Sequence, residues 1–443
     1  MRKLRLLGNI ERGCWLIDQT APMNVLAVAQ VRGRVALARL SVALELVQRR
    51  HPLLRVCVQV EDGLPAYFYS DAPIPLAVME RRDDTHWQEV VTAERNRPFC
   101  SDQAPLLRLT VLHAEEESEL IFTMHHLISD GASSTFILRD LLLALSGQAS
   151  ASSLPPLPER QALEDLMPQS ERGLSGLKRS AHFLAEQAWT FFVRRPLLLA
   201  EQQSVPPLER RSAVSHQQLT KEETSSLLSV CRSHGVTLHG ALCAALLIAV
   251  GAEVRTESAA TDNLLGCCTP VNLRRVLQPQ IGEDIGLYVG PIVTFHRLTA
   301  HTELFALATE LTKQLHAART AGVPARALAT QSRLLPSWVS PQQAAKHLYN
   351  RLFGTVSVTN MGVLDIPLEY GDLRLTAVHI GGANNPYGSL ISIGVTTLAG
   401  QLFLNFNYNE QIVSDERIQR VVSATMRAIR SSSTHPQIRD SSV

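Results

Sequence analysis

The stretch HHLISDG, residues 125–131, decides how the rest of this sequence is interpreted. It follows a strand-like run from Glu119 to Met124 and precedes helical spacing that begins at Phe136. A histidine at the end of a strand can be a neutral base near pH 7. An aspartate four residues later can hold the turn by accepting hydrogen bonds, and a glycine permits a sharp exit from it. On spacing alone, a pair of structural histidines before a loop explains the stretch equally well.

Upstream of this motif, the sequence alternates between helical and strand patterns. Val35 to Arg50 has helical apolar spacing and ends where a proline restricts further helix. Leu53 to Val60 predicts a strand that turns at Asp62-Gly63. Leu106 to Leu112 and Glu119 to Met124 predict a second hairpin. The histidine pair therefore lies at the end of a predicted strand.

Downstream, the alternation resumes after a polar segment rich in proline and serine. These clusters, between residues 146 and 212, indicate a linker and a boundary near residue 205. We therefore expect an N-terminal lobe over residues 1–205 and a C-terminal lobe over residues 206–443. Thr220 followed by Glu223 predicts a reciprocally capped helix start. Later strands are expected at 264–269, 354–359, 373–379, 390–397 and 401–408.

Composition excludes several classes of protein. The 443 residues include 42 Lys and Arg against 41 Asp and Glu, so nucleic acid is not an expected partner. No apolar run reaches the ~18 residues that span a bilayer. The nearest, Val236 to Ala252, contains a histidine and two glycines. The N-terminus lacks the apolar core of a signal peptide, and the seven cysteines form no CxxC pair, so we expect a cytoplasmic protein with reduced thiols.

Motifs of other enzyme classes are missing from the sequence. It contains no GxSxG, HExxH or P-loop motif and no GxGxxG after a strand, so a serine hydrolase, a zinc protease and a nucleotide-binding enzyme are not predicted. His125 and His126 make a poor metal pair because neighbouring side chains on a strand point to opposite faces. We therefore expect no metal.

Several segments, beginning with the histidine motif, resemble one superfamily. HHxxxDG, complete at 125–131, is the signature of condensation domains and CoA-dependent acyltransferases, which include chloramphenicol acetyltransferase. RRHPLLR at 49–55, TPVNLR at 269–274, the glycine-containing segment 285–290 and VTNMG at 358–362 resemble further elements, in family order. The plant DFGWG motif has no match. The overall form is most similar to the stand-alone polyketide-associated acyltransferases.

The resemblance implies a fold and roles for individual residues. The implied fold is α/β, with two chloramphenicol-acetyltransferase-like lobes, each a mixed sheet flanked by helices, and a tunnel between them. His126 matches the catalytic base. Asp130 matches a residue that makes a structural ion pair, for which Arg274 is the candidate partner. Gly131 keeps the turn open, and its backbone N–H is a candidate donor to an oxyanion.

Three further residues are expected to support the site. His125 is interpreted as a scaffold residue and not as a second base. Thr359 and Asn360, in the segment that resembles the late family element, are candidate hydrogen-bond donors near the site. A purely structural strand end is the alternative reading for these two residues.

The implied reaction is acyl transfer from a CoA or carrier-protein thioester to a hydroxyl, which forms an ester. No permanently bound cofactor is expected, because a thioester of CoA or phosphopantetheine is already activated. The sequence contains no carrier-protein serine motif and no adenylation segment, so we expect a stand-alone, monomeric enzyme that meets an acyl carrier protein or acyl-CoA. Two alternatives stay open: a condensation enzyme that forms an amide with an amine acceptor, and a non-catalytic domain that docks carrier proteins.

Residues 172–195 form a basic segment with interleaved aromatic residues. It contains five basic residues and one acidic residue. A helix of this composition can lie on a membrane surface or cover an apolar acyl channel. An ordinary linker helix packed on a lobe is the alternative. Peripheral membrane contact through this segment is therefore a hypothesis that the sequence leaves open.

Overall fold

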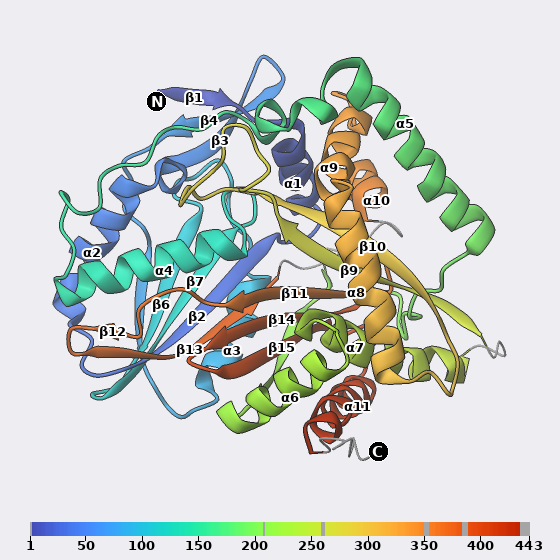
Figure 1. The fold of residues 1–443 in the computed structure, drawn as a ribbon. Helices are drawn as coiled ribbons and strands as arrows, with labels where there is room; N and C mark the ends of the chain where they lie inside the picture. The colour runs from blue at the N-terminus through green and yellow to red at the C-terminus, as the bar shows by residue number, and fades with distance from the viewer. Residues whose placement is uncertain (1, 207–208, 258–261, 350–353, 383–388, 435–443) are drawn as a thin grey trace.

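The computed structural model describes residues 2–206, 209–257, 262–349, 354–382 and 389–434. Two six-stranded sheets form its two halves, and helices cover them (Figure 1). A third sheet has three strands, β1 (Lys3–Leu6), β4 (Leu64–Tyr69) and β3 (Val56–Glu61). The predicted α/β architecture of two mixed sheets flanked by helices is confirmed.

The first sheet has the strand order β12-β13-β2-β7-β6-β5. It is mixed because β5 runs parallel to β6 while the other neighbours are antiparallel. The predicted hairpin is formed by β6 and β7, and β7 ends at the first histidine of the motif. The strands are β2 (Asn24–Arg32), β5 (Leu76–Glu80), β6 (Leu107–His113), β7 (Glu117–His125), β12 (Glu369–Tyr370) and β13 (Leu373–Gly381).

Helices cover both faces of the first sheet. α2 (Leu37–Arg50) and α4 (Gly131–Ser146) pack on one face, and α3 (His86–Asn96) packs on the other. The alternation of β2 explains this arrangement. Ala27 and Ala29 belong to the core that includes α2 and α4, whereas Leu26 and Val28 pack against Trp87 of α3. Successive side chains of a strand point to opposite faces, so an almost entirely apolar strand is buried on both sides.

The second sheet has the strand order β10-β9-β11-β14-β15-β8 and is also mixed, because β11 runs parallel to β9 and β14. Its strands are β8 (Ser212–Leu219), β9 (Asn263–Asn272), β10 (Val289–Leu298), β11 (Val356–Val363), β14 (Ile391–Leu398) and β15 (Gln401–Asn409). The helices of this half and its surroundings are α5 (Gly173–Trp189), α6 (Lys221–Ser233), α7 (Leu238–Glu257), α8 (Leu304–Thr320), α9 (Val323–Leu334), α10 (Pro341–Tyr349) and α11 (Asp415–Thr434). α1 (Asn9–Asp18) packs against α10 and α9.

α7 is the core helix of the second half. Among the helices that the structure describes, it is long and apolar enough to cross a membrane over Leu238–Thr256, judged by length and composition. The expectation that no segment reaches this length is therefore wrong. However, 67% of that window is buried inside the fold, where α7 contacts α8, α11 and the second sheet. Its apolar character is what a helix surrounded by protein requires.

The chain crosses between the two sheets late in the sequence. β12 and β13 follow most of the second sheet in sequence, yet β13 pairs with β2 and extends the first sheet. β13 also meets β14, where a Cβ atom on Gly394 would lie 2.2 Å from the carbonyl oxygen of Ile380. A glycine is therefore needed where the two sheets meet. The expected boundary at residue 205 stays a prediction, and the first sheet also contains residues 369–381.

Candidate active site

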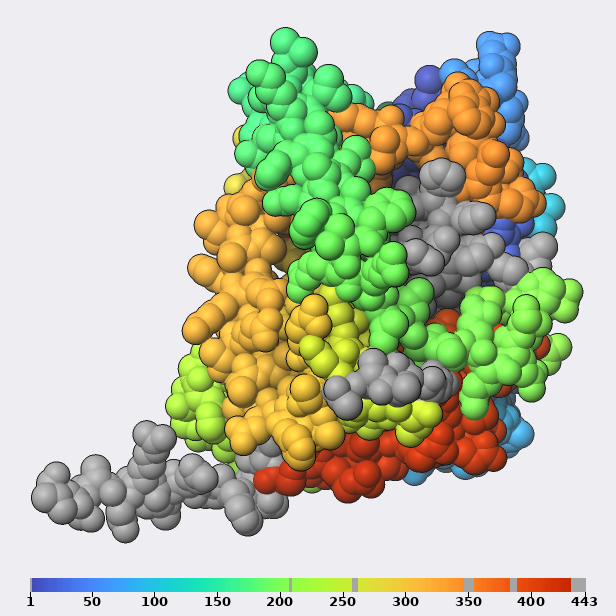
Figure 2. Space-filling view, turned by 90° about the vertical axis from the view of Figure 1, so that its right-hand side faces the viewer, coloured from blue at the N-terminus to red at the C-terminus, as the bar shows by residue number. Residues whose placement is uncertain are grey.

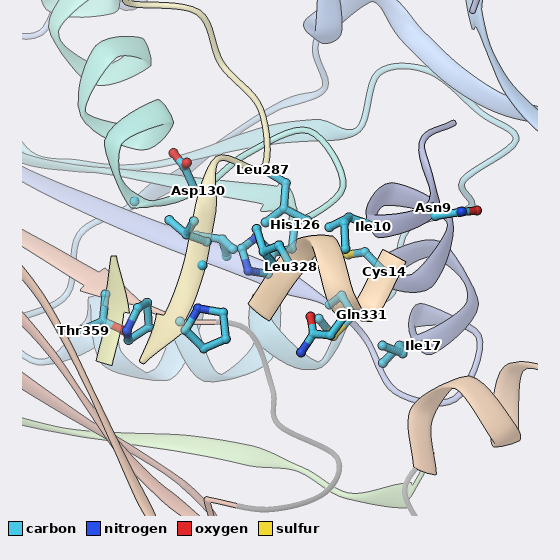
Figure 3. Close-up of a pocket in the computed structure, with 18 of the residues that line it drawn as sticks. Asn9, Ile10, Cys14, Ile17, His126, Asp130, Leu287, Leu328, Gln331 and Thr359 are labelled. Carbon is cyan, nitrogen blue, oxygen red and sulfur yellow. The ribbon is translucent and has the colours of Figure 1, made fainter. Parts of the chain in front are cut away.

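A cavity of about 190 Å³ lies where the two halves meet (Figure 3). His126 and Gly131 of the histidine motif line it from the first half, and Thr359 lines it from the second. Much of the remaining wall is apolar, and three elements contribute to it. Their apolar residues are Ile10, Cys14 and Ile17 on α1, Val289 and Pro291 on β10, and Leu328 on α9, and β2 and β13 add Val25 and Ile380.

His126 is held in one tautomer by the turn that follows it. Its backbone N–H donates to the carbonyl oxygen of Met23 at 2.7 Å. Its ring Nδ1 lies 2.7 Å from the carbonyl oxygen of Ser129. A carbonyl can only accept a hydrogen bond, so Nδ1 carries the proton and Nε2 keeps its lone pair. His126 lies in the middle of the cavity wall in Figure 3, which gives the site one basic nitrogen.

Burial determines the charge state of His126. It lowers the pKa of this imidazole, and the Ser129 carbonyl and the Asp130 carboxylate raise the pKa by less. The net result is a pKa below the ordinary histidine range. His126 is therefore neutral near pH 7, the state that a general base requires.

His125 is turned away from the cavity and is fully buried. Its Nδ1 accepts the backbone N–H of Leu127 at 3.0 Å, so Nε2 is the protonated nitrogen. That nitrogen lies 3.2 Å from Oδ2 of Asp18 at the end of α1. His125 therefore connects the motif to α1, in the position expected of a scaffold residue.

The structure brings Asp130 and Arg274 together across 144 residues of sequence. Nη1 of Arg274 donates to Oδ2 of Asp130 at 2.8 Å, and Nη2 donates to Oδ1 at 3.0 Å. Asp130 also caps α4 by accepting the backbone N–H of Ser133 at 2.8 Å, and it accepts the backbone N–H of Tyr288 at 3.1 Å. The carboxylate thus fastens the motif to the second half of the chain and points away from His126 in Figure 3.

This ion pair is buried on both sides. Burial by itself would raise the pKa of Asp130, but the charge of Arg274 and the hydrogen bonds from Arg274 and Ser133 outweigh burial and lower the pKa. Arg274 also donates to the backbone carbonyl of Asp284 at 3.1 Å and lies over the Tyr288 ring. Asp130 is therefore charged in the folded protein, and its role in the structure is positional.

Gly131 starts α4, and its φ is not among the positive values of the glycines. The expected reason for this glycine, a sharp turn, is therefore not the one that the structure provides. A Cβ atom on Gly131 would lie 2.5 Å from Sδ of Met361, which comes from the second half. Glycine allows Met361 to approach the start of α4 closely.

Thr359 and Asn360 are neighbours in the middle of β11 but have different surroundings. Thr359 lines the cavity. Asn360 accepts the backbone N–H of Gly362 at 2.8 Å through Oδ1 and so holds its own turn, as the structural alternative predicts. Of the two expected donors, the structure places Thr359 at the cavity.

Two groups of residues at or beside the cavity are absent from the sequence-based prediction. On α1, Ile10, Cys14 and Ile17 are spaced by four and three residues, the signal of one helical face. Ser133 is the second omission: its hydroxyl contacts Asp130, Arg274 and the backbone of Gly286. The cue for Ser133 is its place three residues after an aspartate that caps a helix.

Within the ranges that the structure describes, no group of three His, Cys, Asp or Glu side chains is arranged to hold a metal ion. Among the described residues, the polar side chains that line the cavity are those of His126, Thr359, Gln331, Asn9, Asp130 and Cys14.

The structure thus combines a two-lobed α/β fold with a HHxxxDG turn, and the turn meets the second lobe at a shared cavity. The chain is similar to condensation domains and related acyltransferases. Residues 209–405 match the family described as phthiocerol/phthiodiolone dimycocerosyl transferase C-terminus.

Solved structures share this fold along nearly the whole chain. Polyketide synthase associated protein 5 from Mycobacterium tuberculosis superimposes with a TM-score of 0.65 at 17% identity, over 97% of this chain and 98% of that one. Trichothecene 15-O-acetyltransferase from Fusarium sporotrichioides superimposes with a TM-score of 0.71 at 13% identity, over 97% and 95%. The first condensation domain of the CDA synthetase gives 0.71 at 14% identity, over 98% and 97%.

Similar curated proteins are large peptide synthetases. Cyclosporin synthetase from Tolypocladium inflatum is 28% identical over 313 residues, which cover 61% of this chain and 2% of that protein. Surfactin synthase subunit 1 from Bacillus subtilis is 30% identical over 135 residues, which cover 30% of this chain and 4% of that protein. The chain thus matches only a small part of each of these relatives.

Proposed function

We propose that this chain transfers an acyl group from a thioester, carried by CoA or by the phosphopantetheine of a carrier protein, to a hydroxyl acceptor. The observation that carries the proposal is the state of His126. Its proton is fixed on Nδ1 by the Ser129 carbonyl, and the ring lines the cavity shared by both halves. A neutral imidazole with a free Nε2 is suited to remove a proton from an alcohol.

In the proposed step, Nε2 of His126 takes the hydroxyl proton as the acceptor oxygen attacks the thioester carbonyl. The tetrahedral intermediate then collapses, its carbon–sulfur bond breaks, and the thiolate takes the proton from the imidazolium. The products are an ester and a free thiol, and His126 returns to its neutral state. General-base assistance of this kind contributes roughly 10² to 10⁴ in rate.

Two groups are proposed to stabilise the negative oxygen of the intermediate. The backbone N–H of Gly131 is at the first turn of α4, where the helix dipole favours negative charge. The Thr359 hydroxyl lines the same cavity from the second half. The Asp130–Arg274 pair is proposed to act at a distance, by holding the turn on which His126 and Gly131 are mounted.

Ester formation is the first candidate and amide formation is the second. The match to a dimycocerosyl transferase family supports an acyltransferase, and the shared fold of an O-acetyltransferase supports a hydroxyl acceptor. The similarity to peptide synthetases supports an amine acceptor on a carrier protein. A domain that only docks carrier proteins is the remaining alternative.

Thiol release from acyl-CoA and acyl-pantetheine thioesters, with pooled alcohols or pooled amines, tests the proposal. The expected result is release that depends on alcohol and falls roughly 10² to 10⁴-fold in His126→Ala. His301→Ala is the control because that histidine is exposed outside the cavity. Release that depends on amine would favour condensation. Equal release by the wild type and His126→Ala would contradict the role of His126, and no release with any thioester would favour docking.

A further inference from the structure

α5 presents a row of apolar side chains to solvent. Leu174, Leu177, Ala181, Leu184 and Ala188 are spaced by three and four residues, so they share one face of the helix. All five are exposed, Leu174 to 79% and Leu177 to 55%. Figure 2 shows α5 (green) as a ridge on the surface of the molecule. We call these five residues the α5 stripe.

A different face of α5 attaches the helix to the rest of the fold. The buried residues of α5 are Gly176 and Ser180, whose small side chains allow a close approach to α9. The Ser180 hydroxyl accepts hydrogen bonds from Thr330 at 2.9 Å and Arg333 at 2.6 Å. α9 in turn lines the cavity with Leu328. α5 therefore adjoins the wall of the cavity and does not cover it.

The C-terminal end of α5 carries exposed aromatic residues. Trp189 is 63% exposed and Phe192, in the following π-helical turn, is 75% exposed. Phe191 contacts the Phe295 ring edge-on, which anchors this end of the segment to β10. Tryptophan prefers the boundary between water and the apolar part of a bilayer, and phenylalanine is typical of the apolar face of helices that lie there.

The charge around the stripe is positive. Lys178, Arg194 and Arg195 are exposed, and among the residues that the structure describes none of them pairs with a carboxylate. The single acidic residue of the segment, Glu186, lies 3.3 Å from His182. An apolar face flanked by unpaired cations is complementary to a surface of anionic lipids.

We propose that the α5 stripe, with Trp189 and Phe192, binds the surface of a membrane that contains anionic lipids. The apolar side chains enter the boundary region of the bilayer, and Lys178, Arg194 and Arg195 contact lipid phosphates. The spacing of the α5 stripe would also suit packing against a second helix. However, Trp189 and Phe192 are exposed outside the stripe, which favours a lipid surface. The proposal does not depend on the reaction at His126.

Co-sedimentation with vesicles tests this proposal without any turnover. The probes are vesicles of phosphatidylcholine alone and vesicles of phosphatidylcholine and phosphatidylglycerol in equal parts. Wild type is expected to bind the anionic vesicles and to be released by salt. Replacing Lys178, Arg194 and Arg195 by glutamine is expected to weaken partitioning roughly 100-fold, since each basic residue near an anionic surface contributes about fivefold.

A second variant tests the apolar face. Leu177→Asp/Leu184→Asp is expected to abolish binding, and Val42→Asp is the matched control because it changes an exposed apolar residue on α2. All these positions are exposed, so thermal melting should match wild type. Absence of binding by wild type, or equal binding by all variants, would overturn the proposal. So would a concentration-dependent dimer, detected by light scattering, that Leu177→Asp/Leu184→Asp dissociates, because a second copy would then occupy the stripe.

Discussion

At the scale of single residues, the environment of His126 sets the direction of its pH dependence. Burial lowers the pKa of His126 below the ordinary value of 6.5. The neutral form is the base, so kcat/KM is expected to rise with pH through this lowered pKa and to be level at neutral pH. A profile of kcat/KM across the acidic range measures this. A midpoint above 6.5 would contradict the assignment.

Asp130 is expected to matter for folding as much as for activity. Asp130→Ala leaves the Arg274 guanidinium buried without its carboxylate, and breaking a buried pair costs about 3 to 5 kcal/mol. Thermal melting should therefore show a large loss of stability. Asp71→Ala is the control, because it removes an exposed partner of Arg55 and costs about 1 kcal/mol or less. Normal melting of an inactive Asp130→Ala protein would contradict the positional role.

The same pair has a defined pH window. The pKa of Asp130 is lower in the folded protein than its ordinary value of 3.8. Its contribution to stability is therefore complete above the ordinary value and is lost as the pH falls through the folded pKa.

At the scale of elements, α1 is expected to limit the length of the acyl group. Cys14 is buried on the face of α1 that lines the cavity. Cys14→Phe would fill part of the cavity, so long acyl thioesters should lose roughly 10-fold or more in kcat/KM while acetyl thioesters lose little. Cys14→Ala serves as the control because it removes volume instead. If Cys14→Phe lowers kcat/KM equally for long acyl and acetyl thioesters, the acyl group does not lie against α1.

The sequence was informative where an element is specified by its own residues. The helix expected at Val35 to Arg50 is α2, and the Thr220–Glu223 capping box is present at the start of α6. α1 and β2 were not predicted. β2 is buried on both faces, so it lacks the alternation that identifies a half-buried strand. Local spacing also cannot show that β13 belongs beside β2, since the two strands pair between residues 26–32 and 374–381, too far apart in sequence to leave a local pattern.

At the scale of the whole molecule, a cluster of aromatic rings links the two sheets. His379 of β13 is 3% exposed, stacks on Trp87 at 4.4 Å and contacts His216 of β8 edge-on at 4.4 Å. Phe403 of β15 completes the contact. Burial is the larger cause that lowers the pKa of His379 well below 6.5, and the neighbouring His216 is the smaller cause. His379 is therefore neutral in the folded protein near pH 7, and so is His216, whose pKa burial also lowers.

In acid, His379 is protonated more readily in the unfolded chain than in the folded protein, and this should favour unfolding. Because the folded pKa of His379 is lowered, the free energy of unfolding is expected to fall as the pH drops below 6.5. His379→Phe retains a ring against Trp87 and should reduce this pH dependence, measured by urea unfolding at pH 7 and pH 5. If His379→Phe loses as much free energy of unfolding between pH 7 and pH 5 as wild type does, the pH dependence comes from other groups.

Much of the candidate site was predictable from resemblance, and less from the residues themselves. His126, Asp130 and the distant Arg274 were all proposed from motif segments. The cavity wall was not, because it depends on how α1 and α9 pack between the halves. Nor could spacing distinguish the two neighbours Thr359, which lines the cavity, and Asn360, which holds a turn.

The strand crossing has a consequence for synthesis on the ribosome. Until Leu373–Gly381 has been made, β2 has an unpaired edge, although β6 and β7 are already available. About 340 residues separate β2 from β13, which at ~5 to 20 residues per second corresponds to roughly 20 to 70 s. During that interval the nascent chain carries an apolar strand with open backbone hydrogen-bonding groups, the kind of edge that recruits other strands. Slow or paused translation before residue 373 should therefore increase aggregation of this protein, whereas a pause after residue 381 should not.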